Sequence, residues 1–281
     1  MKHLLLLVTL LFSSSFTNAQ ATDSLKVVSW NVFLRPGILR DKQVKRVDSI
    51  AASLLQMNAD VIVLQEVFHK KSRRRLISAL SKSYPFHSKI GKKSIWGVPS
   101  GNCIFSKDSI LSEEFIYFKR SMNADKLAKK GAIAVEINHL GKSFKIHSTH
   151  LQAGGGTEGA HIRTSQLDQL AEMTRSMGRR ITSLFAGDFN IRHDDSLFKY
   201  IVKTLNVTNL NPVNQKLGTS NFDDHTLTST SGTPKWIDFI FLSSYNGVQY
   251  HSSHIEEPRC FFKKKRARIS DHNPIITIFS W

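Results

Sequence analysis

Short apolar runs that end in a polar residue recur along the chain, and they limit the folds that this sequence can form. The runs are rich in Val, Ile and Phe, as β-strands are, and they span residues 26–32, 60–64, 102–106, 132–138, 144–149, 183–186, 236–242 and 274–279. Between some of them, in the segments 44–55 and 167–173, apolar residues recur at the three- and four-residue spacing of an amphipathic helix. The order of strands and helices predicts an α/β fold with a mixed sheet.

One domain is the expected organisation for residues 20–281, because no Pro-, Gly- or Ser-rich linker divides them and no internal repeat occurs. Residues 1–19 have the build of a secretory signal peptide: Lys2 precedes an apolar stretch at 4–12, and small polar residues follow up to Ala19. We expect cleavage after Ala19 and an exported protein, either secreted or periplasmic. The apolar stretch is shorter than the roughly 20 residues that cross a bilayer.

The net charge restricts the class of partner. The chain carries 39 Lys and Arg against 22 Asp and Glu, a formal charge of +17. An excess of this size favours anionic partners such as nucleic acid, phospholipid surfaces or phosphorylated solutes, and does not choose among them. No protein partner is implied, and a monomer is expected. An exported protein can pair Cys103 with Cys260, but their separation in sequence leaves a disulfide open, and Cys103 also fits a small buried hydrophobe.

Polar side chains stand where the predicted strands end. Asn31 follows the first strand, Glu66 the second and His150 a later one, while Asp188 and Asn190 follow the run at 183–186. In sheet proteins of this class, ligand sites gather outside the carboxyl ends of strands. Each residue alone also fits a turn or a helix cap. The set as a whole favours a functional site.

Two further positions join this set. Asp238 lies within an apolar strand, where a carboxylate must be paired or bound to something. Asp271 and His272 come just before the last strand. Asn, Glu and Asp oxygens are hard ligands that suit Mg²⁺ or Ca²⁺, whereas zinc favours more His or Cys at close spacing.

The ordered motifs resemble those of the endonuclease/exonuclease/phosphatase superfamily over nearly the whole chain after residue 19. They are Ser29-Trp30-Asn31, Leu64-Gln65-Glu66, Thr149-His150-Leu151, Gly187-Asp188-Phe189-Asn190, Ile237-Asp238-Phe239-Ile240 and Ser270-Asp271-His272. The resemblance implies a four-layer α/β sandwich, in which two packed mixed β-sheets are flanked by helices.

Several segments look more like the secreted bacterial sphingomyelinase C branch, which cleaves phosphocholine from sphingomyelin. They are Glu66-Val67-Phe68, Lys130-Gly131-Ala132, His150-Leu151-Gln152-Ala153 and Arg163-Thr164-Ser165-Gln166-Leu167. Two segments depart from this branch. Ser29-Trp30-Asn31 is closer to the general nuclease and phosphatase form, and Gly154-Gly155-Gly156 replaces the usual residues after the Gln-Ala pair.

The resemblance implies a metal cofactor and assigns its ligands. Glu66 would be the main ligand with help from Asn31, and Asp271 would support the metal or its waters. The ion implied is Mg²⁺ or another divalent cation such as Mn²⁺, Co²⁺ or Ca²⁺.

The resemblance also implies the roles of the reacting groups. His272 would be the general base, because an imidazole accepts a proton near neutral pH, and Asp238 would orient it. Asp188 and Asn190 would position the attacking water and the phosphate, while His150 would hydrogen-bond the phosphate and protonate the leaving oxygen. His147, three residues before His150, should point to the opposite face of its strand and pack there.

A basic and aromatic run lies immediately before Asp271 and suggests a binding surface. Phe261 and Phe262 adjoin Lys263, Lys264 and further cations. Exposed Phe with Lys suits a phospholipid surface, and the same run suits a nucleic-acid backbone. In a third interpretation, both Phe side chains pack inward and the charges are solvated. Arg163, near the Gly-rich turn, is a candidate for lining the substrate mouth or an ordinary exposed residue at a helix start.

Three enzymatic functions fit these observations. The leading hypothesis is a secreted, divalent-metal-dependent phosphodiesterase acting on sphingomyelin or a related phospholipid. The alternatives are a secreted Mg²⁺-dependent nuclease and a phosphatase of soluble phosphates such as inositol phosphates. A non-catalytic binding module would require broken site residues, and the motifs are intact.

Overall fold

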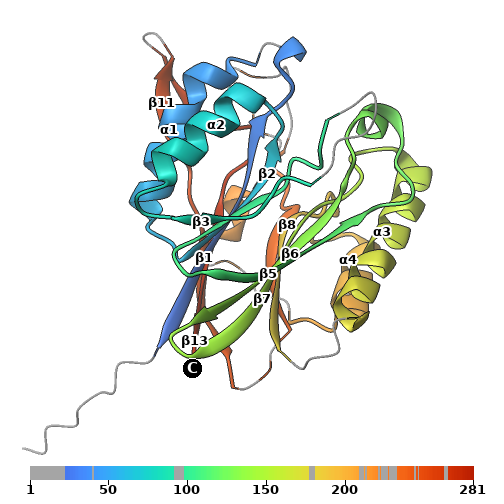
Figure 1. Cartoon of the computed structure of the whole chain (residues 1–281). Helices are drawn as coiled ribbons and strands as arrows, with labels where there is room; N and C mark the ends of the chain where they lie inside the picture. The colour runs from blue at the N-terminus through green and yellow to red at the C-terminus, as the bar shows by residue number, and fades with distance from the viewer. Residues whose placement is uncertain are drawn as a thin grey trace, which may run out of the picture.

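Two β-sheets pack face to face, and pairs of helices cover their outer faces (Figure 1). This computed structural model describes residues 23–39, 41–91, 98–176, 181–208, 212, 214–220, 222, 227, 233–243, 245, 247–262 and 265–281. The four-layer α/β sandwich predicted from the sequence is confirmed. Residues 1–19, assigned to a signal peptide, lie outside the described residues.

The first sheet has six strands in the order β10–β13–β1–β2–β4–β3. They are β1 (Ser24–Leu34), β2 (Val61–Val67), β3 (Phe86–His87), β4 (Cys103–Ser106), β10 (Gln249–Ile255) and β13 (Ile275–Ser280). β1 runs parallel to β2 and antiparallel to β13, so the sheet is mixed. Helices α1 (Gln43–Met57) and α2 (Lys70–Leu80) pack on its outer face and against each other.

The second sheet has five strands in sequential order, with only the β7–β8 pair parallel. They are β5 (Ile110–Tyr117), β6 (Gly131–His139), β7 (Lys142–His150), β8 (Thr182–Asp188) and β9 (Asp238–Ser243). Helices α3 (Gly156–Ser176) and α4 (Ser196–Leu205) cover its outer face. A separate hairpin, β11 (Arg259–Phe262) with β12 (Lys265–Arg268), stands at one end of the molecule, and short 3-10 turns occur at η1 (Gly37–Leu39), η2 (Asn123–Leu127) and η3 (Gln215–Leu217).

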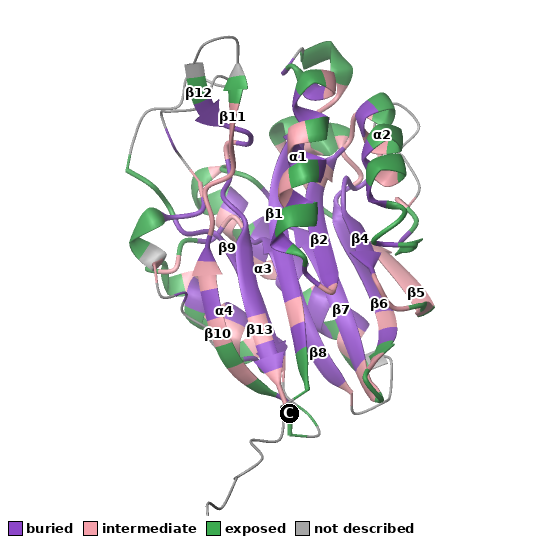
Figure 2. Ribbon diagram, turned by 90° about the vertical axis from the view of Figure 1, so that its left-hand side faces the viewer, coloured by how far each residue is buried: buried purple, intermediate pink, exposed green. Residues whose placement is uncertain are grey.

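The two-residue period of the strands separates the two cores. In β1, Val27 packs into the core that contains the second sheet, while Val28 and Trp30 pack into the core shared with α1. Side chains of alternate strand residues point to opposite faces, so Asn31 shares the inter-sheet face of Val27. Figure 2 shows the central strands buried along most of their length. The same face that builds the inter-sheet core therefore carries polar side chains at its end.

The sequence-based prediction found most central elements and missed several peripheral ones. Each predicted strand has an observed counterpart, and the two helical segments fall within α1 and α3. Strands β3, β5 and β10 and the β11–β12 hairpin were not predicted. Cys103 and Cys260 are both free; Cys103 is buried, which raises the pKa of its thiol to about 12. Among the described residues, no helix is long and apolar enough to span a membrane.

His147 lies on the helix-covered face of β7, as its spacing from His150 predicted. It is fully buried, and its ring stacks on Phe185 with the ring centroids 4.4 Å apart. Neither ring nitrogen has a hydrogen-bond partner among the described residues. Burial, with a smaller contribution from the charge of Lys145, lowers the pKa of His147 to about 3.

We predict that His147 makes the fold sensitive to acid. Its pKa is lower in the folded chain than the unfolded value near 6.5, so the unfolded state binds the extra proton and stability falls as pH drops below about 6.5. At pH 5 the loss amounts to about 2 kcal/mol. In His147→Phe, which keeps the ring stack, unfolding followed by denaturant titration should lose about 2 kcal/mol less stability than the wild type between pH 7 and 5, while the buried His150 keeps its own contribution.

The control is His161→Gln, because His161 is exposed on α3. That variant should follow the wild-type pH profile. An equally steep acid loss in His147→Phe would show that His147 is not the responsible group.

Candidate active site

Three acidic and basic side chains from the second sheet meet at one end of its inter-sheet face. His150 and Asp188 are direct neighbours across the parallel β7–β8 pair, and Asp188 is the direct neighbour of Asp238 across β8–β9. In β8, Asp188 continues the alternation of Leu184 and Ala186, which places it on the face toward the first sheet. All three polar side chains are buried.

Asn31 joins this group to the first sheet. Its amide nitrogen donates to Glu66 Oε1 and to Asp188 Oδ2, both at 3.2 Å. Its oxygen accepts from the backbone N–H of Phe33 at 3.1 Å. Asn31 thus holds two carboxylates from different sheets, and its part in metal ligation stays a prediction.

Glu66 reaches this face through an unusual backbone conformation. By strict alternation it would point toward the helices with Ile62 and Leu64, which pack in the α1–α2 core. Its φ of 59° is in the left-handed region, which is costly for a residue with a Cβ. The β1–β2 register also shifts beyond Asn31. Strain of about 1–3 kcal/mol at such a residue is typical of functional sites.

His272 and Asp238 form a buried hydrogen-bonded pair. His272 Nδ1 lies 2.8 Å from Asp238 Oδ2, and Nε2 lies 3.7 Å from Asp188 Oδ2. The backbone oxygen of His272 accepts from Trp30 Nε1 at 2.9 Å, and Thr219 Oγ1 accepts from the N–H of Asp238 at 3.1 Å. These hydrogen bonds hold His272 and Asp238 in place. The Asp238 carboxylate, which is unusual in an apolar strand, is therefore paired with His272.

The two histidines have opposite protonation preferences. Burial lowers the pKa of His272, but the charges of Asp238 and Asp188 outweigh it and hold that pKa well above its usual value. Burial, Lys130 and His272 hold the pKa of His150 well below its usual value. Burial and the neighbouring Asp238 raise the pKa of Asp188 to about 7. Near neutral pH these shifts favour the charged form of His272 and the neutral form of His150.

A divalent cation fits the end of the site that holds Glu66 and Asp271. Burial and the like charge of Asp271 both raise the pKa of Glu66. A bound cation would offset the repulsion between these two carboxylates. Carboxylate oxygens are the ligands that Mg²⁺ prefers. Ligand atoms of Asp188, Asp238 and His272 also lie within 4.8 Å of one another. His272, however, is already paired with Asp238 and has a raised pKa, so Glu66 and Asp271 are the more suitable cation ligands.

Asn190 and Arg163 position the loops around the site. The backbone N–H of Asn190 donates to Asp188 Oδ1 at 2.9 Å, and its side chain donates to Leu151 O at 3.2 Å. Arg163 Nη1 donates to the carbonyls of Gln152 and Gly154 at 3.1 and 2.9 Å. Arg163 thereby fixes the loop that follows His150, and a substrate contact for it stays a prediction.

Sequence patterns did not single out Arg46, a buried residue beside the site. Arg46 Nη1 donates to Val32 O at 3.0 Å and to Ile269 O at 2.8 Å, and its Nη2 donates to Phe33 O. It therefore ties the end of β1 to the segment that carries Asp271 and His272. The sequence did contain one indication of this role: Arg46 lies on the apolar face of α1, with Val47 and Ile50.

The predicted binding surface is partly described. Phe261 lies on the β11–β12 hairpin opposite Arg266 and is 72% exposed, so it does not pack inward. The side chain of Phe262, and Lys263 and Lys264, lie outside the described residues.

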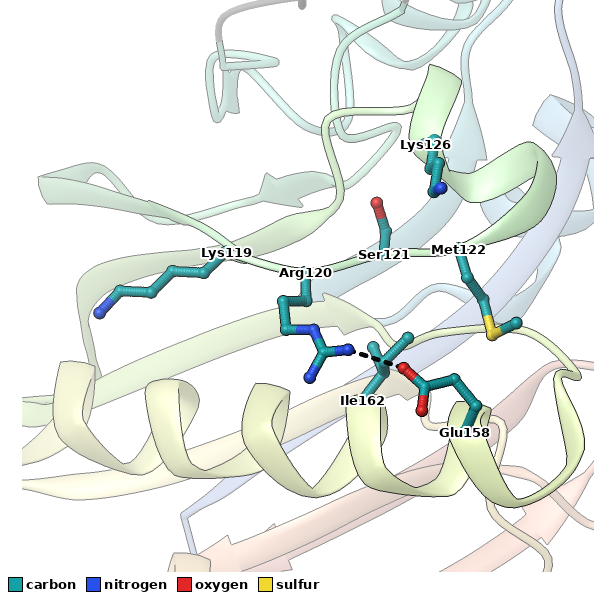
Figure 3. Close-up of a pocket in the computed structure, with 7 residues that line it drawn as sticks. All are labelled: Lys119, Arg120, Ser121, Met122, Lys126, Glu158 and Ile162. Atoms are coloured by element: carbon teal, nitrogen blue, oxygen red, sulfur yellow. Dashed lines mark hydrogen bonds and ion pairs between the residues drawn. The ribbon is translucent and has the colours of Figure 1, made fainter.

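A cationic cavity lies beside the loop at 118–130. It has a volume of about 550 Å³ and lies between this loop and the first turns of α3 (Figure 3). It is lined by Lys119, Arg120, Ser121, Met122, Lys126, Glu158 and Ile162. Arg120 pairs with Glu158 at 2.7 Å. None of the buried catalytic candidates lines it, so the cavity is separate from the centre described above.

The comparisons with known proteins agree with this geometry. A family model described as "Endonuclease/Exonuclease/phosphatase family" matches residues 28–272. Sphingomyelinase C of Bacillus cereus is 28% identical over 230 residues, which cover 70% of this chain and 69% of that protein. The crystal structure of SmcL is 25% identical with a TM-score of 0.78, and covers 92% of this chain and 99% of its own. A beta toxin variant from Staphylococcus aureus, with bound magnesium ions, shares the fold at 23% identity and a TM-score of 0.75, over 91% of this chain and 99% of its own.

We predict that Mg²⁺ stabilises the folded protein through Glu66. A bound cation offsets the repulsion between Glu66 and Asp271, so it should raise the melting temperature by an amount that grows with Mg²⁺ concentration. In Glu66→Gln the increase should be lost or require at least about tenfold more Mg²⁺, as measured by differential scanning fluorimetry.

Glu172→Gln is the control, since Glu172 is exposed on α3 and pairs only with Arg175 among the contacts of the described residues. It should keep the wild-type response to Mg²⁺. A wild-type response in Glu66→Gln would place the cation elsewhere, with Asp188 and Asp238 the next site to test.

Proposed function

The chain belongs to the endonuclease/exonuclease/phosphatase family, and we propose that it is a divalent-metal-dependent phosphodiesterase that hydrolyses sphingomyelin or a related phospholipid. The observation that carries the chemistry is the buried His272–Asp238 pair, 2.8 Å apart, beside further carboxylates at one edge of the sandwich. The similarity to Sphingomyelinase C supports the lipid substrate. Export through residues 1–19 stays a prediction.

The negative charge of the site means that a phosphodiester can bind only if a cation offsets that charge. Glu66, Asp188, Asp238 and Asp271 surround the position that an anionic phosphate would approach, and they would repel it. When bound, a divalent cation offsets this charge, polarises the phosphoryl group and stabilises the leaving oxygen. Glu66 and Asp271 are the residues that would hold it, and Mg²⁺ suits their oxygen ligands.

His272 is the proposed general base. Asp238 accepts the hydrogen bond from Nδ1, which fixes the tautomer and leaves Nε2 to accept a proton from water. The surrounding carboxylates raise the pKa of His272. Offsetting part of their charge lowers that pKa toward neutral pH, where an imidazole is most effective as a base.

His150, Asp188 and Asn190 are the proposed positioning and acid groups. His150 Nε2 lies 3.5 Å from Asp188 Oδ2, in a buried setting that keeps the ring neutral. A neutral imidazole can donate a hydrogen bond to the phosphate. To protonate the leaving oxygen, His150 would first have to gain a proton and act as imidazolium. Asp188 and the Asn190 amide would orient the attacking water and the phosphate.

The exposed side chains of the β11–β12 hairpin support the proposal that the protein acts at a lipid surface. Phe261 is exposed and faces solvent together with the cation of Arg266 across the hairpin. An exposed aromatic beside basic residues suits the headgroup region of a phospholipid bilayer. The hairpin is followed directly by the segment that carries Asp271 and His272, so docking it would bring the active site to the lipid.

We predict metal-dependent release of phosphocholine from sphingomyelin vesicles. EDTA should abolish release, and both His272→Ala and Asp238→Asn should lower it at least about a hundredfold at saturating Mg²⁺, because proton transfer typically contributes 10²–10⁴-fold. Headgroup release is measured with an enzyme-coupled choline assay. His161→Ala, at an exposed position of α3, should retain wild-type turnover.

The same preparations incubated with linear and supercoiled DNA distinguish the nuclease hypothesis. Intact DNA with headgroup release supports the lipid substrate. DNA cleavage without headgroup release, lost in His272→Ala, would overturn the lipid proposal and establish a nuclease.

A further inference from the structure

The most exposed large apolar side chain among the described residues is Ile38. It is 88% exposed, and its neighbour Leu39 is 49% exposed. Both lie on η1, in the segment between β1 and α1. We call residues 35–39 and 41 the η1 loop. Two adjacent aliphatic side chains in water are unfavourable unless another apolar surface covers them.

The η1 loop is braced, so its apolar tip is held outward. The Arg35 guanidinium donates two hydrogen bonds to the Asp41 carboxylate, at 2.7 and 2.9 Å, which closes the base of the loop. Gln43 Nε2 donates to Arg35 O at 3.1 Å, and Leu39 N–H donates to Pro36 O at 3.0 Å. These bonds brace the described part of the loop while Ile38 stays exposed.

Arg46 joins the η1 loop to the segment between the hairpin and the catalytic residues. Its Nε donates to Asp41 O at 3.0 Å, and its Nη1 donates to Ile269 O at 2.8 Å. Ile269 directly follows β12 and precedes Asp271 by two residues. The η1 loop, the hairpin and the catalytic segment are therefore fixed to one buried cation.

The η1 loop and the hairpin stand at the same end of the molecule. Figures 1 and 2 both show the segment between β1 and α1 and the β11–β12 hairpin projecting at the end opposite the C-terminus. This is the end where β1 places Asn31 and the site. Exposed Lys42, Lys70 and Lys71 flank the loop, because the N-terminus of α2 packs beside Gly37 through His69.

We propose that the η1 loop is a membrane-insertion element, with Ile38 and Leu39 entering the boundary between lipid headgroups and acyl chains. Apolar side chains ringed by lysines match that boundary, because the apolar groups gain burial and the cations meet phosphates. Together with Phe261, they give two contact points at the end of the molecule that carries the site, which would set its orientation to the bilayer. The proposal rests on the proposed lipid substrate and identifies the surface that reaches it.

The test is vesicle binding by the full chain carrying Ile38→Asp and Leu39→Asp together. The vesicles contain phosphatidylcholine and phosphatidylserine, and EDTA is present so that binding is measured without turnover. Co-sedimentation should show affinity reduced by roughly tenfold or more, because two apolar side chains no longer insert. Turnover of the soluble diester bis(p-nitrophenyl) phosphate with Mg²⁺ should stay at the wild-type value.

The matched control is Leu111→Asp with Leu140→Asp. Both leucines are 60% exposed, and Leu140 lies in the turn before β7, at the opposite end of that strand from His150. This variant should bind vesicles as the wild type does. Equal binding by the η1-loop variant and wild type, equal losses in both double variants, or no vesicle binding by the wild type would each overturn the proposal.

A second variant adds a fluorescence signal that reports insertion directly. Ile38→Trp should bind vesicles at least as tightly as the wild type, and brominated acyl chains should quench the added fluorescence. Absence of extra quenching would exclude insertion of the η1 loop. Failure of sphingomyelin hydrolysis with these binding results intact would reject the proposed substrate alone, since vesicle binding is measured in EDTA and does not require hydrolysis.

Discussion

Repulsion among carboxylates that are buried or half-buried is the constraint on which the candidate active site depends. Asp188 and Asp238 are adjacent across two strands, and Glu66 lies near Asp271. A cluster of neighbouring carboxylates is stable only where hydrogen bonds and positive charges offset the repulsion among them. Asn31 bridges the two sheets, His272 carries a raised pKa, and a divalent cation fits the remaining negative charge. The chemistry proposed for the protein uses the same charges that the fold must neutralise.

The architecture brings that site to one edge and supports it from both sheets. Parallel pairing of β1 with β2, and of β7 with β8, sends the carboxyl ends of these strands in a common direction within each sheet. Face-to-face packing then brings Asn31 against Asp188. Arg46 links the end of β1 to Ile269, so the catalytic segment and the exposed features beside it share one buried anchor. The proposed chemistry and the proposed membrane contact thus depend on the same buried residue.

Several features were predictable because they depend on local pattern. The runs at 26–32 and 183–186 are apolar enough to identify central strands, and the residues after them are conspicuously polar. Strand β5 escaped prediction because its residues are mostly half-buried, so the alternation between apolar and polar residues is weak. Helix α2 begins after a cap that no local pattern indicates: the His69 ring accepts a hydrogen bond from the Ser72 N–H.

The sequence by itself determined the strand and helix periods, the positions of Asn31, Glu66, Asp188, Asp238 and His272 at strand ends or within strands, and the family resemblance, because side-chain type and spacing are local properties. Only the tertiary structure decided that Asn31 turns its nitrogen to two carboxylates, that Glu66 adopts a left-handed backbone, and that Arg46 joins segments 223 residues apart. These depend on sheet packing, which sets distances between distant segments that no local pattern encodes.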